Sequence, residues 1–71
     1  MPLKVFQSAI KKRIRLIMRK DKIYEGILED YDVHINVYLT DATEISDSGC
    51  SIYLGSTIIN GGSIALIDIC D

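Results

Sequence analysis

Three polar residues at alternate positions, Asp32, His34 and Asn36, form the part of the sequence best suited to chemistry. An aspartate next to a histidine can imitate a general base with the group that orients it. No nucleophile can be assigned beside them, because the chain has one His and no Ser/His/Asp arrangement. The sequence also lacks a metal-ligand cluster and a glycine-rich phosphate loop. It therefore predicts a non-enzymatic protein without a cofactor.

The chain is small, with 71 residues and a mass of 8.0 kDa. Hydrophobic residues make up 48% and charged residues 25%, which is the balance of a globular chain rather than a disordered one. We expect a single domain over residues 1–71 with a thin core. Cys50 and Cys70 are too few and too far apart for a disulfide framework or a zinc knuckle, so we expect two reduced thiols.

No continuous apolar span of about 20 residues is present, so we expect no membrane segment. The apolar stretch before Lys11 is too short for a secretory signal. We therefore expect a cytoplasmic protein.

The net charge of −2 conceals a strong asymmetry along the chain. All eight basic residues fall within the first 22 positions, where Asp21 is the one acidic residue. Residues 24–71 hold nine acidic residues and neither Lys nor Arg. This asymmetry predicts one face that attracts a polyanion and another that repels it. The alternative is that the two segments neutralise each other within the fold or between subunits.

The spacing of apolar residues predicts a short amphipathic helix over residues 2–10. Pro2 lies near its start, and Leu3, Phe6 and Ile10 share one side. From residue 13 the period changes to two, which is typical of strands. Five strands are expected, over residues 13–19, 23–29, 34–40, 51–59 and 63–69.

Several residues define how these strands bend and connect. Gly26, in the middle of the second strand, predicts a sharp bend. Alternation in the third strand places His34 and Asn36 side by side on its polar face. The acidic, serine-rich segment 41–49 is expected to be a loop or a frayed hairpin end, and residues 60–62 a tight connection with positive φ angles. The order predicts a small, strongly bent, all-β barrel of five antiparallel strands capped by the helix.

The last two expected strands are apolar on both faces and contain no Lys. Exposed edges of this kind would aggregate. Each edge is therefore expected to pair with the edge of another copy, so that a head-to-tail rotation closes a ring. Oligomerisation would also add the buried area that so short a chain lacks.

Two segments carry a recognisable order of residues. The first comprises residues 13–16, 24–28 and 32–39, and the second comprises residues 54–61 followed by 64–67. Together they resemble the two motifs of the Sm and Sm-like (LSm) family of RNA-binding ring proteins, over nearly the whole chain. The resemblance implies rings most often of seven subunits, which bind single-stranded, uridine-rich RNA near the central hole. Chains as short as this one look most like archaeal members.

The resemblance also implies a site for a uracil base. His34 would be its stacking surface and Asn36 would hydrogen-bond its edge, with Asp32 orienting Asn36. An unstacked base needs a flat π partner, and an amide can both donate to uracil and accept from it. Gly61 would let the backbone approach closely.

One position departs from the family at this site. Where an Arg commonly precedes the glycine of the second motif, this chain has Asn60, so a planar cation is missing. Asn60 is expected to face His34 across the base, and binding is expected to be weak. The basic N-terminal region, including Lys11 and Lys12, is expected to supply the electrostatic attraction for RNA.

Two functions remain open from the sequence. The first is a homo-oligomeric ring, a homo-heptamer by the resemblance, that binds single-stranded uridine-rich RNA in RNA processing or turnover. The second is a scaffold ring with little RNA affinity, which binds protein partners through its acidic surfaces. Salt-dependent RNA binding distinguishes them, because an electrostatic mode weakens steeply as salt rises.

Overall fold

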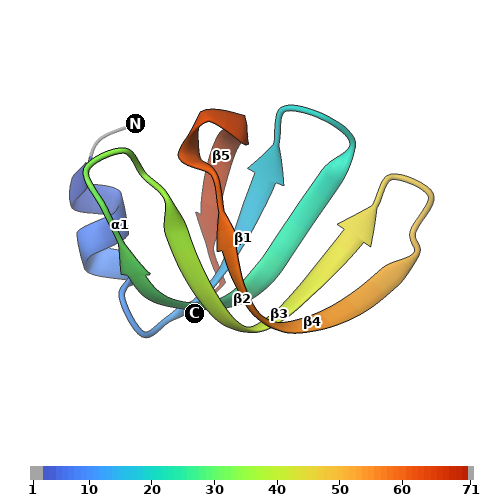
Figure 1. Ribbon diagram of the computed structural model, residues 1–71, viewed down its shortest axis with the longest axis horizontal. Coiled ribbons are helices and arrows are strands. Elements are labelled where there is room, and N and C mark those ends of the chain that lie inside the picture. Colours follow the sequence, from blue (N-terminus) through green and yellow to red (C-terminus); the bar gives the residue numbers. More distant parts are fainter. Residues whose placement is uncertain (1–2, 71) are drawn as a thin grey trace.

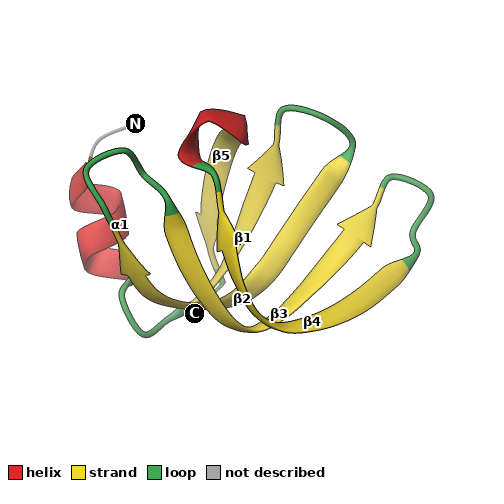
Figure 2. Cartoon of the chain, in the orientation of Figure 1, coloured by secondary structure: helices red, strands yellow, loops and turns green. Residues whose placement is uncertain are grey.

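The computed structural model describes residues 3–70, and it shows one short helix packed against a strongly bent sheet (Figures 1 and 2). The elements are α1 (Leu3–Ala9), β1 (Arg13–Met18), β2 (Lys22–Tyr31), β3 (Val37–Ser46), β4 (Ser51–Ile59), the 3-10 helix η1 (Gly61–Ser63) and β5 (Ile64–Ile69). The sheet order is β4-β3-β2-β1-β5, and every neighbouring pair is antiparallel. The predicted all-β fold with an N-terminal helix is confirmed.

Helix α1 covers one side of the sheet through Phe6 and Ala9, which are fully buried. The Phe6 ring lies 5.8 Å from the ring of Tyr31, between centroids. The expectation that Leu3 shares the buried side is wrong, because 44% of its surface is exposed. Pro2, expected near the helix start, lies outside the described residues. Within residues 3–70 no helix is long and apolar enough to cross a membrane.

The core lies inside the curve of the sheet, where alternate residues of the strands meet the helix. In β1, Ile14 and Leu16 are fully buried, as the two-residue period predicted. Arg15, which lies between them, is exposed. The complete buried set is Phe6, Ala9, Ile14, Leu16, Leu28, Val37, Leu39, Ala42, Ile59 and Ile64.

The bend crosses three neighbouring strands. In β2 the register with β3 shifts across Gly26, between Glu25 and Ile27, and a Cβ atom at Gly26 would lie 2.8 Å from the Thr40 carbonyl oxygen. In β3 Asp41 has a φ of 50°, and in β4 Gly55 has a φ of 74° opposite Ala42. Gly26 therefore marks the predicted sharp bend, which the neighbouring strands share.

The third strand differs from the prediction at both ends. It begins at Val37 instead of residue 34, because the Asp32 side chain bonds the following backbone N–H groups and turns residues 32–36 into a loop. Ile35 in that loop has a φ of 60°, which excludes strand alternation. His34 and Asn36 are therefore loop residues and do not share the polar face of a strand.

The loop or frayed hairpin end expected over residues 41–49 is wrong for residues 41–46. Residues 41–46 continue β3, since they pair with β2 on one side and with β4 on the other. Only residues 47–50 form the turn to β4, and all four are exposed. Backbone pairing on both sides overrides the weak strand propensity of acidic and serine residues.

The connection between β4 and β5 is a 3-10 helix rather than a tight turn with positive φ angles. Its cap is Asn60, whose side-chain oxygen accepts the Gly62 N–H at 2.8 Å. Neither Gly61 nor Gly62 has a positive φ. This connection joins the two opposite edges of the sheet, β4 and β5. Both edges carry exposed apolar side chains, including Ile52, Ile58 and Leu66.

Candidate functional site

The loop between β2 and β3 is organised by one carboxylate, that of Asp32. Its Oδ1 accepts the backbone N–H of His34 at 2.8 Å and that of Asn36 at 3.0 Å. Its Oδ2 accepts the Asn36 Nδ2–H at 3.0 Å. These donors, with the Asn36 side chain first, lower the pKa of Asp32 from its ordinary value. The loop is therefore held in shape by the ionised form of Asp32.

Acid is expected to release this loop. Because the pKa of Asp32 is lowered in the folded chain, its contribution is complete above the ordinary carboxyl pKa of 3.8 and disappears as the pH falls through the lowered value. The measurement is the NMR shift of the His34 and Asn36 amides from pH 6 to pH 2. Both should titrate together, below the ordinary carboxyl range, and an Asp32→Asn variant should show no such titration. Amide shifts that are independent of pH would contradict this role of Asp32.

Asn36 joins this loop to η1. Its Oδ1 accepts the Gly61 N–H at 3.3 Å, while its Nδ2 donates to Asp32. A primary amide has two N–H donors and two acceptor lone pairs. One of each is therefore left for a ligand, in an orientation set by Asp32 and Gly61.

Position 61 requires glycine because there is no room for a side chain, and not because the backbone has a positive φ angle. A Cβ atom at this position would lie 2.3 Å from the carbonyl oxygen of His34 and 2.4 Å from that of Ile35. Such contacts are far shorter than ordinary van der Waals distances. Glycine thus allows η1 to lie directly against the loop of residues 32–36.

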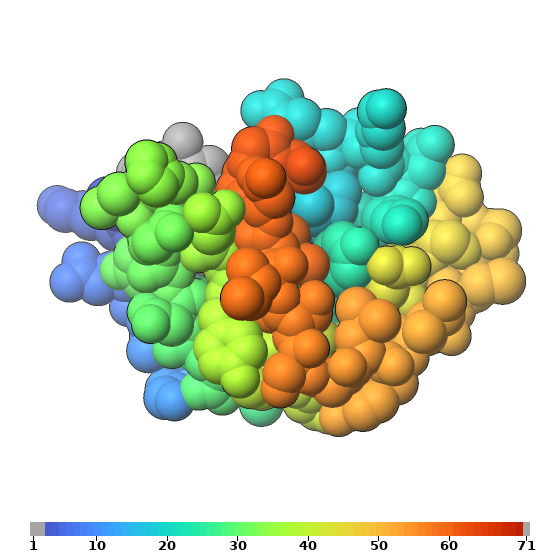
Figure 3. All heavy atoms as spheres, in the orientation of Figure 1, coloured from blue at the N-terminus to red at the C-terminus, as the bar shows by residue number. Residues whose placement is uncertain are grey.

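His34 is exposed and lines a hollow of about 360 Å³. The hollow lies where η1 passes between the β2–β3 loop and the β1–β2 turn. In Figure 3, the orange-red atoms of this connection lie between the green and cyan segments. Its lining residues are Arg19, His34, Ile35, Gly61, Gly62, Ile64 and Ala65.

Arg19 was not predicted as a site residue. Its backbone N–H donates to the Ser63 carbonyl at 2.9 Å, and its Nε–H donates to the Gly62 carbonyl at 3.1 Å. These bonds bring the β1–β2 turn to η1 from the side opposite the β2–β3 loop. In the sequence Arg19 is one of eight basic residues near the N-terminus, and nothing there links it to residue 62.

Asn60 does not line the hollow that contains His34. Its Oδ1 is used by the Gly62 N–H, and the residue lines a larger hollow of about 630 Å³ together with Met18, Tyr24 and Ile58. The expected position of Asn60, facing His34 across a base, is therefore not the one in the structure. Capping of η1 turns its side chain toward its own backbone instead.

Lys11 and Lys12 lie in the connection between α1 and β1. Figure 1 shows this connection at the lower end of the fold, whereas the loop of residues 32–36 lies at the upper end. Lys11 forms an ion pair with Glu29, while Lys12 is exposed and has no ion-pair partner among residues 3–70. The structure does not place these two lysines beside His34 and Asn36.

Part of the N-terminal positive charge is neutralised within the fold. Every ion pair found in residues 3–70 joins a basic residue of the first 22 positions to an acid of β2 or β3. They are Lys11–Glu29, Arg13–Glu25, Arg13–Asp41, Arg15–Glu25 and Lys22–Glu44. The alternative of internal neutralisation therefore holds for four of the eight basic residues. Within the part of the chain that is described, Lys4, Lys12, Arg19 and Lys20 take no part in it.

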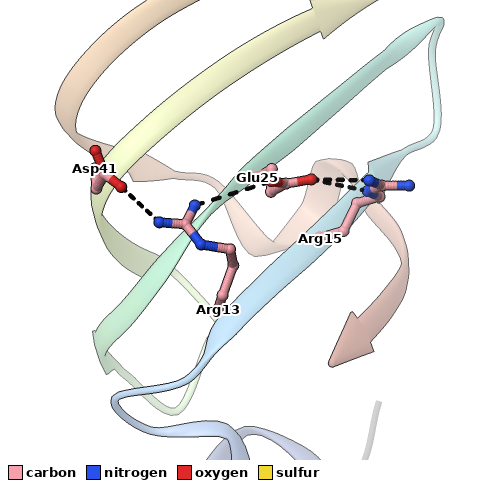
Figure 4. A network of polar contacts seen from close by, with 4 residues as sticks. All are labelled: Arg13, Arg15, Glu25 and Asp41. Atoms are coloured by element: carbon pink, nitrogen blue, oxygen red, sulfur yellow. Dashed lines mark hydrogen bonds and ion pairs between the residues drawn. The ribbon is translucent and has the colours of Figure 1, made fainter. Parts of the chain in front are cut away.

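Figure 4 shows the central part of this ion-pair network. Glu25 lies between two arginines and accepts both Nε–H and Nη2–H of Arg15, at 3.2 and 2.8 Å. Arg13 contacts Glu25 at 3.9 Å and Asp41 at 2.5 Å. The Arg13 guanidinium, followed by the Tyr53 hydroxyl, holds the pKa of Asp41 below its ordinary value. These arginines thus tie β1 to β2 and β3.

Comparison with known proteins places this geometry in a family. The LSM domain model matches residues 4–69. A Pyrococcus abyssi protein described as snRNP Sm-like is 33% identical over 66 residues, which cover 93% of this chain and 88% of that protein. An Archaeoglobus fulgidus protein of the same description is 29% identical over 66 residues, which cover 93% of this chain and 86% of that protein.

Solved structures agree with this match. A Pyrococcus abyssi Sm protein in complex with a uridine heptamer has a TM-score of 0.89 and 32% identity, and the match covers 97% of each chain. A heptameric archaeal Sm protein has a TM-score of 0.86 and 29% identity, over 96% of this chain and 98% of that one. Because the family model spans nearly the whole chain and archaeal Sm proteins share its fold, the chain belongs to the LSM domain family.

Proposed function

We propose that this chain assembles into a homo-heptameric ring that binds single-stranded, uridine-rich RNA during RNA processing or turnover in the cytoplasm. Its role is binding rather than catalysis. Support comes from two similar solved proteins, one described as heptameric and one in complex with a uridine heptamer.

Ring formation is supported by the two edges of the sheet. No neighbouring strand covers β4 or β5 on its outer side among residues 3–70. Ile58 on β4 is 74% exposed and Leu66 on β5 is 61% exposed. Pairing β4 of one copy with β5 of the next would satisfy the backbone groups of both edges and bury these side chains.

Base recognition rests on one observation: Asp32 fixes the Asn36 amide within the same loop that carries the exposed His34. The remaining N–H donor and lone pair of Asn36 can pair with uracil O4 and N3–H. The His34 imidazole offers a flat surface on which the base can stack. Gly61 keeps η1 close enough to hold Asn36 from its other side.

We propose that affinity is modest, for two reasons. The Asn60 side-chain oxygen accepts the Gly62 N–H, and the neutral amide brings no positive charge to the base. Lys11 has its charge offset by Glu29, so Lys12 is the stronger of the two in attracting RNA. Both lysines then act at long range, through the field that draws in a polyanion.

The test is a titration of labelled oligouridine and oligoadenine against the assembled protein at two salt concentrations. His34→Ala should lower oligouridine affinity by about 1–3 kcal/mol per stacked base. Lys12→Ala is the control, since it should weaken both oligonucleotides equally and flatten the salt dependence. If His34→Ala leaves oligouridine binding unchanged, the proposed site is wrong.

The internal ion pairs support a second candidate, a scaffold ring that binds protein partners. Four basic residues are offset by acids of the sheet, which reduces the positive charge available to RNA. In that case neither oligonucleotide should bind measurably at low salt. The same titration therefore separates the two candidates.

A further inference from the structure

The hollow around η1 contains two flat polar side chains that reach it from different elements. His34 comes from the β2–β3 loop and Arg19 from the β1–β2 turn. We propose that Arg19 is a second wall of the base site, with its guanidinium stacking on the base and attracting the adjoining phosphate. This inference rests on the proposed function, because it assigns a further residue to the same RNA site.

Arg19 differs from the other two arginines in what its guanidinium contacts. Arg13 and Arg15 donate to the carboxylates of Asp41 and Glu25. Arg19 donates through Nε to a backbone carbonyl, and no carboxylate pairs with it among residues 3–70. It is thus the arginine of the described chain whose positive charge is left for a ligand.

The contacts of Arg19 fix its position relative to η1. Its backbone N–H bonds the Ser63 carbonyl, and its Nε–H bonds the Gly62 carbonyl. The Nε bond orients the guanidinium plane and leaves Nη1 and Nη2 without a hydrogen-bond partner in residues 3–70. A planar cation held in advance loses little side-chain freedom when it meets a base.

The rest of the hollow suits a flat ligand. Gly61 and Gly62 contribute no side chains, and the volume of about 360 Å³ falls within the range of small-ligand sites, roughly 300–1,000 Å³. An imidazole and a guanidinium both stack on π systems, and the guanidinium also attracts phosphate. A nucleotide of a single strand combines a flat base with an adjacent negative charge, which matches this lining.

The test compares three variants of the assembled protein. Arg19→Gln keeps a donor for the Gly62 carbonyl but removes the charge and the guanidinium plane. Arg19→Lys keeps the charge without the plane. Lys20→Gln is the matched control, because Lys20 is the next residue, is exposed, and has no ion-pair partner in residues 3–70. Native mass spectrometry verifies that each variant keeps the wild-type particle mass.

Oligouridine affinity should fall roughly 5- to 150-fold in Arg19→Gln, the range that loss of a stacking partner produces. Lys20→Gln should change it less than about threefold, as expected for one peripheral charge. Arg19→Lys should keep the wild-type salt dependence while recovering only a minor part of the affinity. If Arg19→Lys binds as well as wild type, the stacking role is wrong.

Failure of this inference can be told apart from failure of the proposed function. If His34→Ala weakens binding while Arg19→Gln behaves like Lys20→Gln, Arg19 is not part of the site and the proposed function stands. If neither His34→Ala nor Arg19→Gln weakens oligouridine binding, both proposals are wrong.

Discussion

Replacing Ile58 by Lys is expected to break the proposed ring into smaller species, mostly single subunits. Ile58 lies near the end of β4, an edge of the sheet, and is 74% exposed in the isolated chain. In an edge-to-edge ring this side chain is buried, so Lys would bring an unpaired charge into the contact. Loss of apolar burial alone costs about 1.5–3 kcal/mol at each contact. Native mass spectrometry at micromolar concentration measures the outcome.

Val33→Lys is the matched control for this change. Val33 is 77% exposed, but it lies in the β2–β3 loop and not on an edge strand. Its replacement should leave the particle mass unchanged, while Leu66→Lys on β5 should act like Ile58→Lys. A ring that survives both edge variants would show that the subunits associate through another surface.

Gly61→Ala is expected to damage both the stability of the subunit and its binding of oligouridine. The added Cβ atom would lie 2.3 Å from the His34 carbonyl oxygen, so η1 and the loop of residues 32–36 must move apart. Overpacking of this kind typically costs about 1–3 kcal/mol. The movement also breaks the bond from the Gly61 N–H to Asn36, which orients the amide. Urea unfolding and oligouridine titration measure the two effects.

Gly62→Ala provides the control at the adjacent position. A Cβ atom there meets only the Asn60 side-chain oxygen, at 3.2 Å, and a side chain can shift more easily than a backbone. The loss of unfolding free energy should therefore be well below that of Gly61→Ala. Equal losses at both positions would mean that the glycines matter for the flexibility of η1 and not for close packing against His34.

Local patterns were enough to predict the strands in which apolar and polar residues alternate regularly. The two-residue period of Ile14 and Leu16 identified β1, and Gly26 marked the bend of β2. Residues 34–36 were wrongly predicted as the start of the third strand, because their alternation of polar and apolar residues is typical of a strand. The hydrogen bonds of the Asp32 side chain reshape that segment, and spacing alone does not register them. Residues 41–46 were wrongly predicted to lie outside the strands, because acidic residues and serine are typical of loops. In the structure this segment pairs with both β2 and β4.

Only those residues of the candidate site that belong to the two family motifs could be predicted from the sequence. The resemblance brought Asp32, Asn36 and Gly61 into one proposal, and the structure places these three in hydrogen-bonding contact. The side-chain direction of Asn60 depends on the 3-10 geometry of its own turn, which the sequence did not predict. Arg19 reaches the site through bonds to Gly62 and Ser63, more than 40 residues away, and no local pattern encodes such a contact.

The connections at the two ends of β4 differ in how well they can accept inserted residues. At its C-terminal end, η1 spans from one edge of the sheet to the other and touches His34, so an inserted residue there would disturb the contacts of both edges and of the loop. At its N-terminal end, the turn of residues 47–50 is exposed and projects away from η1 (Figure 1). A reporter peptide or an additional domain can be grafted into that turn, where chain growth costs little loop entropy and leaves η1 and the loop of residues 32–36 untouched.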